Sequence, residues 1–303
     1  MAHARDWSEA LEASDASPQE IVRRCARLAR RMRGDALAWW PGSPWREPVL
    51  AAPLLWLALL EHGFEREEGG GASNPLVGEL AAILARARDG GARTVLGRAL
   101  ALTLGRGAWD GAALDEALGA ARALEHGGTF ATRRALAERA VAWSGGTATA
   151  WARLASGGRE RHVEELRTRI EAGLAAERLA RWTADPAGQL ASGRLVVPVD
   201  ELARANLAVT VLAESPTDAR IAALVASQVG WIRGFLARAW PAVELAGVWR
   251  GRALALWLGG VERCLRRIES RRFEVARRAV APPRANWLAL ARFATPEGYR
   301  ELA

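Results

Sequence analysis

Lysine is absent from this chain of 303 residues, so all 42 of its basic residues are arginine. We attribute the uniform use of arginine to a GC-rich coding sequence, which makes the formal net charge of +8 weak evidence for a nucleic-acid partner. Acidic residues are interspersed with the arginines, as on solvated helix faces. Of the functions considered, an Arg-rich helical nucleic-acid binder has the least support. Such a protein would be recognised by nucleic-acid binding that weakens steeply with salt, and nothing in the sequence demands this activity. We therefore predict no nucleic-acid partner, while a basic surface facing anionic lipid or a diphosphate stays open.

Cysteine and long hydrophobic runs are also scarce. Cys25 and Cys264 are far apart and have neither disulfide-framework nor zinc-site spacing, which favours a reducing compartment. The longest apolar run, 49–60, has 12 residues, whereas a bilayer requires about 20. Residues 1–20 are polar and acidic, unlike a signal or transit peptide. We expect a cytoplasmic protein that contacts the inner face of a membrane at most peripherally.

Strand signals are missing as well. Ala, Leu, Arg and Glu dominate, which favours helices, and the one strand-like run, 195–197, is too short to matter. Ser17, Pro18 and Glu20 form a helix start. We predict an all-α fold with helices at about 17–32, 48–64, 74–88, 91–104, 111–124, 131–155 (broken or bent near 145–146), 160–183, 218–240, 244–270 and 286–293.

The length suits one large domain. Half of the residues are hydrophobic, which is enough for a sizeable core, and no sequence period indicates a solenoid. We predict a polar N-terminal tail over 1–16, a single helical domain over 17–293 and a C-terminal tail over 294–303.

One stretch, RWTADPAGQLASGRLVVPVDEL at 181–202, organises the rest of the chain. Leu174, Arg178, Leu179 and Trp182 recur at helical spacing before it. Asp185 and Pro186 end that helix, because a proline lacks the backbone N–H and restricts the residue before it. A polar segment then leads to Pro198, where a new element begins.

This order resembles the second aspartate-rich motif of the squalene/phytoene synthase family, D-x-x-E-D-x-x-x-G-R-x-Y-L-P. Asp185 takes the place of the first Asp, 193–194 that of the Gly-Arg pair, and Pro198 that of the last Pro, without a gap.

Three positions of the motif differ in this chain. Gln189 stands where the second metal-binding Asp belongs, Gly188 replaces the Glu, and Val196 replaces the Tyr. The family's first aspartate-rich motif also has no counterpart, since no Asp occurs between Asp35 and Asp89.

Two further segments carry the resemblance. Residues 130–145 are similar to Y-x-T-x-x-x-L-x-x-Y-x-x-x-V-A-G, with Phe130 and Arg139 in place of the two tyrosines. Residues 264–278 are similar to I-L-D-x-I-E-x-x-G-Y-D-V-x-x-R-R. The resemblance thus covers about half of the chain, over 130–293.

The resemblance implies a single large helical domain of the class I isoprenoid synthase type with a central cavity. It implies a Mg²⁺-dependent prenyltransferase that condenses or converts farnesyl diphosphate or a longer prenyl diphosphate in hopanoid or carotenoid biosynthesis. Magnesium requires oxygen ligands from carboxylates and from the substrate's phosphates. The implied residues are Asp185, Glu65 and Glu68 for the metal, Asp185 and Gln189 for catalysis, and Arg194, Phe130, Arg139 and Arg181 for the substrate.

Each of these residues has a structural alternative. Asp185 before a proline is equally typical of a turn that ends a helix, Glu65 and Glu68 lie in a Gly-rich loop as solvated acids do, and Arg194 suits a loop anchor. The alternative function is a catalytically inactive member of the same fold. Such a protein would bind a prenyl diphosphate or an isoprenoid lipid, or assemble with an active paralogue.

Overall fold

The computed structural model describes residues 8–33, 52–53, 55–57, 59–60, 75–105, 111–125, 129–156, 160–191, 195–214, 218–275 and 279–280. Helices are the regular elements within these ranges, which contain two isolated bridges and no strand. The predicted all-α fold is thereby confirmed.

The named helices follow closely on the predicted ranges. They are α2 (Pro18–Arg33), α5 (Pro75–Arg88), α6 (Val95–Gly105), α7 (Gly111–Glu125), α8 (Arg133–Ser156), the 3-10 helix η2 (Glu160–His162), α9 (Val163–Ala184), α10 (Pro186–Ala191), α11 (Val199–Arg204), α12 (Val211–Glu214), α13 (Ala219–Ala239), α14 (Pro241–Leu245) and α15 (Val248–Ser270).

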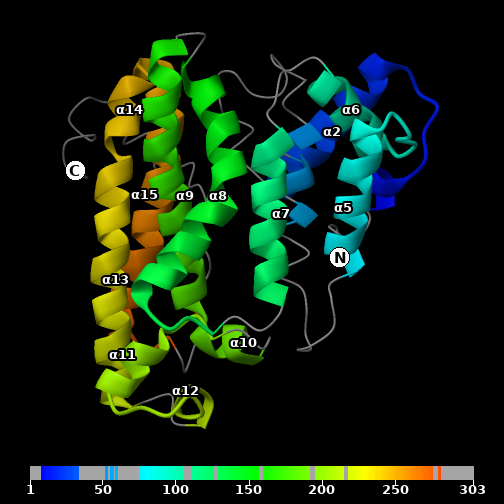
Figure 1. Ribbon diagram of the computed structural model, residues 1–303. Helices are drawn as coiled ribbons and strands as arrows, with labels where there is room; N and C mark the ends of the chain where they lie inside the picture. Colours follow the sequence, from blue (N-terminus) through cyan, green and yellow to red (C-terminus); the bar gives the residue numbers. More distant parts are fainter. Residues whose placement is uncertain are drawn as a thin grey trace.

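Four long helices, α8, α9, α13 and α15, lie side by side in one half of the molecule (Figure 1). Helix α9 packs against α8, α13, α14 and α15 and is the central element of this bundle. Helices α2, α5, α6 and α7 form a second group, and α7 lies against α8 (Figure 1). Helix α8 therefore joins the two groups.

The segment before α2 is attached to the second group. Its Ala10 is fully buried, and Ala13 forms an antiparallel bridge with Thr94. The backbone N–H of Val95 donates to the Glu12 carbonyl at 2.9 Å. The division into a tail and a domain at residue 16 stays a prediction, and residues 8–16 lie against the start of α6.

Two helices begin with a proline at positions where the sequence predicted only the end of the preceding helix. Pro186 is the first residue of α10, and Pro241 is the first residue of α14. A proline fits there because the first-turn N–H groups have no partner within the helix. The predicted polar loop after Asp185 is therefore corrected to a short helix. The predicted helix over 244–270 is also wrong at its start, because Gly247, with φ 76°, separates α14 from α15.

Helix α8 runs without interruption through Gly145 and Gly146, so the predicted break there is wrong. Both glycines are buried, and α8 packs against α7 and α9. Tertiary packing outweighs the low helix propensity of the two glycines. The predicted helix at 286–293 and most of the one at 48–64 lie outside the described residues.

Candidate functional site

The candidate site is built on the C-terminal half of α9, because this part of the helix is almost entirely enclosed by its neighbours. Residues 173–176, 178–180 and 182–184 are all buried. The helix ends at Ala184, and Asp185 is its C-cap residue. Side chains on this part of α9 are therefore inside the protein or at its lower end, as Figure 1 is drawn.

Asp185 joins α9 to α10 and caps the second helix. Its Oδ1 accepts a hydrogen bond from the backbone N–H of Gly188 at 2.9 Å, and its carbonyl accepts one from Gln189 at 3.0 Å. A Cβ atom at residue 188 would lie only 2.2 Å from Oδ2 of Asp185. The carboxylate thus occupies space that only a glycine leaves open. Asp185 therefore has a structural role at this helix boundary. Its place before a proline had indicated such a role as the alternative to metal binding.

The other predicted site residues are distributed around this junction. Phe130 is buried just before α8, and its carbonyl accepts a hydrogen bond from Val199 at 2.8 Å. Arg139 on α8 and Gln189 on α10 are half-buried. Arg181, one turn before Asp185, donates to Glu177 at 3.2 Å. The predicted residues Glu65, Glu68 and Arg194 lie outside the described residues.

We tested whether the described residues fit a magnesium ion. No group of three or more His, Cys, Asp or Glu among them could hold a metal. Asp185 already uses Oδ1 for the Gly188 N–H, and the Gln189 amide would contribute no charge. The described residues alone therefore do not fit Mg²⁺, which binds through carboxylates and substrate phosphates. The ligand roles of Glu65 and Glu68 stay a prediction.

A buried arginine, which the sequence analysis used only to define the helix and did not predict as a site residue, lies on the same helix. Arg178 is 7% exposed, and its guanidinium carbon is 4.7 Å from the centre of the Trp143 ring on α8. It precedes Asp185 by seven residues, which is about two helical turns. The two side chains therefore start from the same face of α9. The seven-residue spacing between Arg178 and Asp185 was the signal in the sequence that could have identified Arg178 as a candidate site residue.

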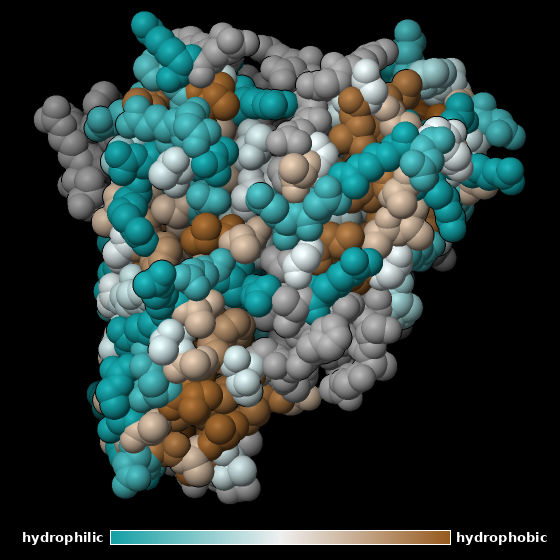
Figure 2. Space-filling model, viewed as in Figure 1, coloured by the Kyte–Doolittle hydropathy of each residue, from teal (hydrophilic) through white to brown (hydrophobic). Residues whose placement is uncertain are grey.

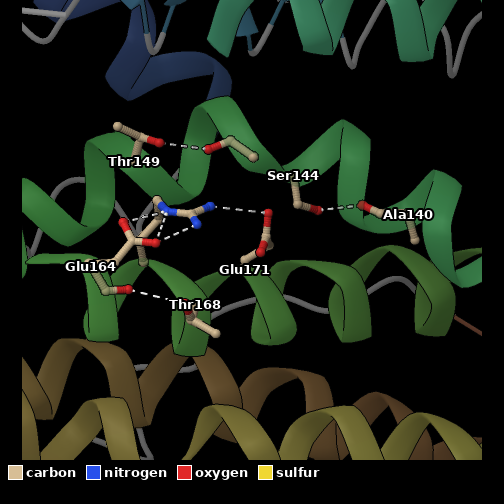
Figure 3. Close-up of polar contacts among 8 residues, drawn as sticks. Ala140, Ser144, Thr149, Glu164, Thr168 and Glu171 are labelled. Carbon is tan, nitrogen blue, oxygen red and sulfur yellow. Dashed lines mark hydrogen bonds and ion pairs between the residues drawn. The ribbon is translucent and has the colours of Figure 1, made fainter. Parts of the chain in front are cut away.

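A cluster of acids lies farther along the same face. Glu171 is seven residues before Arg178 and points from α9 toward α8 (Figure 3). A Cβ atom at Gly145 would lie 3.7 Å from Glu171 and 3.5 Å from Glu116 of α7, so both carboxylates flank this glycine. Arg167 binds Glu164 at 2.6 Å and Glu171 at 3.6 Å. Burial raises the pKa of Glu171, the Arg167 charge lowers it, and nearby Glu116 and Glu164 raise it further, so the net shift is upward.

On the opposite side of α9, an indole fixes a carboxylate. Trp257 of α15 donates from Nε1 to Glu177 Oε2 at 2.7 Å, and Glu177 in turn holds Arg181. The Trp257 ring lies so near α9 that a Cβ atom at Gly173 would be 2.5 Å from it. Trp151 packs edge-on against Trp257 with ring centres 4.8 Å apart. These tryptophans are packing residues of the bundle, one of the roles expected of large aromatic side chains.

A buried ion pair holds α11 against the bundle. The Glu201 side chain is 2% exposed and contacts the guanidinium of Arg133, which also donates to Ser227 of α13 at 2.5 Å. Arg133 lies 5.6 Å from the centre of the Trp231 ring. This pair fixes the segment after residue 195 beside the start of α8. Glu201 lies in the stretch 181–202 but was not among the site residues predicted from the sequence.

The lower end of the bundle has hydrophobic residues on its surface. Figure 2 shows them grouped over α11 and α12, where Val199 is 44% and Val209 is 37% exposed. Arg204 and Arg220 are nearby in the chain, paired with Asp200 and Asp218. None of the described helices is both long and apolar enough to cross a membrane.

Comparison with known proteins agrees with this architecture. The squalene/phytoene synthase family model matches residues 178–286, from the middle of α9 past the end of α15. The chain is similar to the squalene synthase HpnC from Alicyclobacillus acidocaldarius, with 17% identity, coverage of 84% of this chain and 95% of that chain, and a TM-score of 0.69. It is also similar to a dehydrosqualene synthase solved in complex with a ligand, with 14% identity, coverage of 94% and 97%, and a TM-score of 0.74. No curated protein sequence matches the chain.

Proposed function

We propose that this chain is a member of the squalene/phytoene synthase family, whose model matches residues 178–286, and that it binds a prenyl diphosphate between its helices and converts it in isoprenoid biosynthesis. The observation that carries the proposal is the family match over 178–286. This match contains the α9–α10 junction, where, by the resemblance of 181–202, Asp185 would take the first position of the family's second aspartate-rich motif. The proposed substrate is farnesyl diphosphate or a longer homologue.

The proposed roles of the side chains follow from their chemistry. Arg194 and Arg181 would bind phosphate oxygens, since a guanidinium matches phosphate geometry, while Phe130 and Arg139 would contact the substrate near the start of α8. Members of this family are typically dependent on a divalent metal. When bound, such a metal supplies positive charge to the departing diphosphate. Asp185, Glu65 and Glu68 would be its ligands, with Gln189 beside them.

A second candidate function is favoured by the geometry of Asp185. Its carboxylate caps α10 and is confined by Gly188, so its coordination of a metal would compete with a structural role. The chain would then be a catalytically inactive member of the fold that binds an isoprenoid lipid or assembles with an active paralogue. Peripheral contact with a membrane also stays a proposal, and we place it at the hydrophobic end around Val199 and Val209.

Turnover and binding measurements distinguish the two candidates. The purified full chain is incubated with farnesyl or geranylgeranyl diphosphate and Mg²⁺, and both diphosphate release and hydrocarbon products are measured. Metal-dependent conversion supports the first candidate. Binding without conversion supports the second candidate. Absence of binding to either substrate overturns the first candidate and leaves, of the second, only a protein that binds another isoprenoid lipid or assembles with a paralogue.

Asp185→Asn is the appropriate variant for the role of Asp185. An asparagine keeps the oxygen that caps α10 but removes the charge. If Asp185 is a metal ligand, we expect turnover to fall by about 100-fold or more while the melting temperature changes little. Unchanged turnover in Asp185→Asn would refute the metal role.

A further inference from the structure

The C-terminal half of α15 carries an arginine whose charge has no partner. Arg263 is half-buried, and its Nη2 atom is buried without a hydrogen-bond partner in the described part of the chain. Arg267, one turn further along the same helix, is exposed. Partial burial of an unpaired guanidinium is costly, because it loses hydrogen bonds to water that nothing replaces. A charge kept in such a place is a candidate for binding an anion.

The electrostatics of Arg263 differ from those of a paired arginine of the same bundle. Burial lowers the pKa of Arg263, and the like charge of Arg267 lowers it further. For Arg233 of α13 the net shift of the pKa is upward, and the largest cause is its hydrogen bond to Glu269. A bound anion would stabilise the charge of Arg263 as the carboxylate of Glu269 stabilises that of Arg233.

The two acids of this part of α15 are engaged on another face of the helix. Arg233 binds Glu262 at 3.1 Å and Glu269 at 2.6 Å, so both carboxylates are directed toward α13. Consecutive helical residues are about 100° apart around the axis. The face with Arg263 and Arg267, each one position away from the face with Glu262, is therefore positively charged.

The helix dipole explains only one of the two arginines. Cations are stabilised at the C-terminal end of a helix, but the effect is confined to about the last turn. Helix α15 ends at Ser270, and Arg267 lies in its last turn. Arg263 precedes the end by seven residues, which is about two turns. The position of Arg263 therefore requires another reason.

The face with Arg263 and Arg267 leads toward the end of the bundle at which α9 ends. Arg271, two turns beyond Arg263, donates from Nη1 to the Ala279 carbonyl at 2.9 Å. The next residue, Val280, donates its backbone N–H to the carbonyl of Ala184, the last residue of α9, at 2.9 Å. From Arg263 to Arg271 the distance along the helix axis is about 12 Å.

We propose that Arg263 and Arg267 together bind a phosphate group at the surface of α15. Residues four apart on a helix are neighbours, with about 5–6 Å between their Cβ atoms, so both guanidinium groups can reach the oxygens of one phosphate through their planar donors. Free inorganic diphosphate and the headgroup of an anionic phospholipid share this chemistry. The proposal is independent of the proposed function, since neither residue is assigned to the prenyl diphosphate.

Titration calorimetry of the full chain with inorganic diphosphate, in the presence of EDTA, is the first measurement. We expect Arg263→Met and Arg267→Met each to weaken binding by about fivefold or more, through the loss of charge-assisted hydrogen bonds. The matched control is Arg266→Met, which removes the same charge from a position between the two. Arg266 pairs with Glu262 at 3.1 Å, so this variant should change the affinity by less than about twofold.

Cosedimentation with vesicles separates the two sources of phosphate. Vesicles of phosphatidylglycerol and phosphatidylcholine are compared with vesicles of phosphatidylcholine alone. If Arg263→Met and Arg267→Met weaken only the binding of diphosphate, the site takes the free anion, and if they weaken only the binding of the anionic vesicles, it takes the lipid headgroup. The proposal is overturned if the wild type binds neither probe, or if both variants bind both probes as the Arg266→Met control does.

Thermal unfolding without added anion checks the premise that Arg263 is unpaired. Methionine at this position removes a half-buried charge that has no partner, so the melting temperature should stay the same or rise. A fall of more than about 5 °C would show that the guanidinium stabilises the fold, and this result would also overturn the proposal. Arg267→Met changes an exposed side chain, so it keeps the binding test valid whatever the stability of Arg263→Met.

Discussion

The carboxylate of Asp185 lies directly over Gly188, so close that a Cβ atom at position 188 would be 2.2 Å from Oδ2 and 2.7 Å from Cγ. Gly188 therefore does more than continue a short helix. It lets Asp185 fold back and accept the hydrogen bond that caps α10. The replacement of the family's Glu by glycine and the capping role of Asp185 are two parts of one local structure.

The first prediction is that Gly188→Ala destabilises the protein, although alanine is the better helix former. The methyl group would displace the carboxylate and remove a cap worth about 0.5–2 kcal/mol, so we expect a loss of about 1–3 kcal/mol in the free energy of unfolding, measured by urea denaturation. In the Asp185→Ala background the same change should be neutral or stabilising by up to about 1 kcal/mol. Equal effects of Gly188→Ala in both backgrounds would show that Asp185 is not the obstacle.

The second prediction concerns the contact of α9 with α15. Gly173→Ala would place a Cβ atom 2.5 Å from the Trp257 ring and 2.9 Å from Leu258. We expect a loss of about 1–3 kcal/mol, because overpacking forces a rigid ring out of its position. Thermal unfolding followed by circular dichroism measures this loss.

Gly230→Ala provides the matched control for that variant. Gly230 lies inside the long helix α13, and a Cβ atom added there would meet no atom of the described residues within 4 Å. Alanine there should stabilise the protein by up to about 1 kcal/mol, through helix propensity alone. A stabilising effect at both glycines would contradict the close packing of Trp257 on α9.

Much of the helical framework was predictable because its signals are local. Ser17 and Pro18 predict the start of α2, and apolar spacing predicts α9 to within a residue or so of its end at Ala184. The helix α10 was not predictable from the same rules, because Asp185 and Pro186 are equally good signals for the end of one helix and the beginning of the next.

The candidate site was less accessible from sequence than the fold. The register of α9 places Arg178 on the face of Asp185, yet its burial and its contact with Trp143 depend on how α8 packs. The same holds for Gly145, where the glycines predicted a broken or bent helix and α8 runs on without a break. Contacts with α7 and α9 override that preference, and such tertiary contacts leave no local trace in the sequence.

The third prediction concerns the ion pair that anchors α11. Glu201→Gln removes the charge of a 2%-exposed side chain and leaves Arg133, which is 30% exposed, without that partner. Loss of one member of a buried pair costs about 3–5 kcal/mol. Since solvent reaches Arg133, we expect a smaller loss of about 2–3 kcal/mol in the free energy of unfolding. The exposed pair of Arg134 and Glu138, at 86% and 63%, is the control, and Glu138→Gln should change stability by less than about 0.5 kcal/mol.

The fourth prediction is a pH dependence that originates at Glu171. Its folded-state pKa is raised above the ordinary value of 4.5, first by burial and then by the charges of Glu116 and Glu164, against the opposing charge of Arg167. The folded protein therefore holds the proton more tightly than the unfolded chain. The contribution of Glu171 to stability must therefore fall as pH rises above about 4.5 and through the folded-state pKa of this group. Glu171→Gln removes this titration, so its free energy of unfolding relative to the wild type should increase over that range in urea denaturation series.

Glu269 supplies a control with the opposite sign. Hydrogen bonding to Arg233, at 2.6 and 2.7 Å, lowers the pKa of Glu269 below 4.5. Its ion pair therefore stabilises the protein above that pH, and this contribution is lost as pH falls through the lowered value. Glu269→Gln should be less stable than the wild type at neutral pH, and the difference should shrink on acidification.

Because the network of Arg233 joins α13 to α15 and does not contact Glu171, the two effects should add within about 0.5 kcal/mol in the double variant. A pH-independent difference for Glu171→Gln, with the Glu269 control behaving as described, would show that the acids around Gly145 do not resist ionisation.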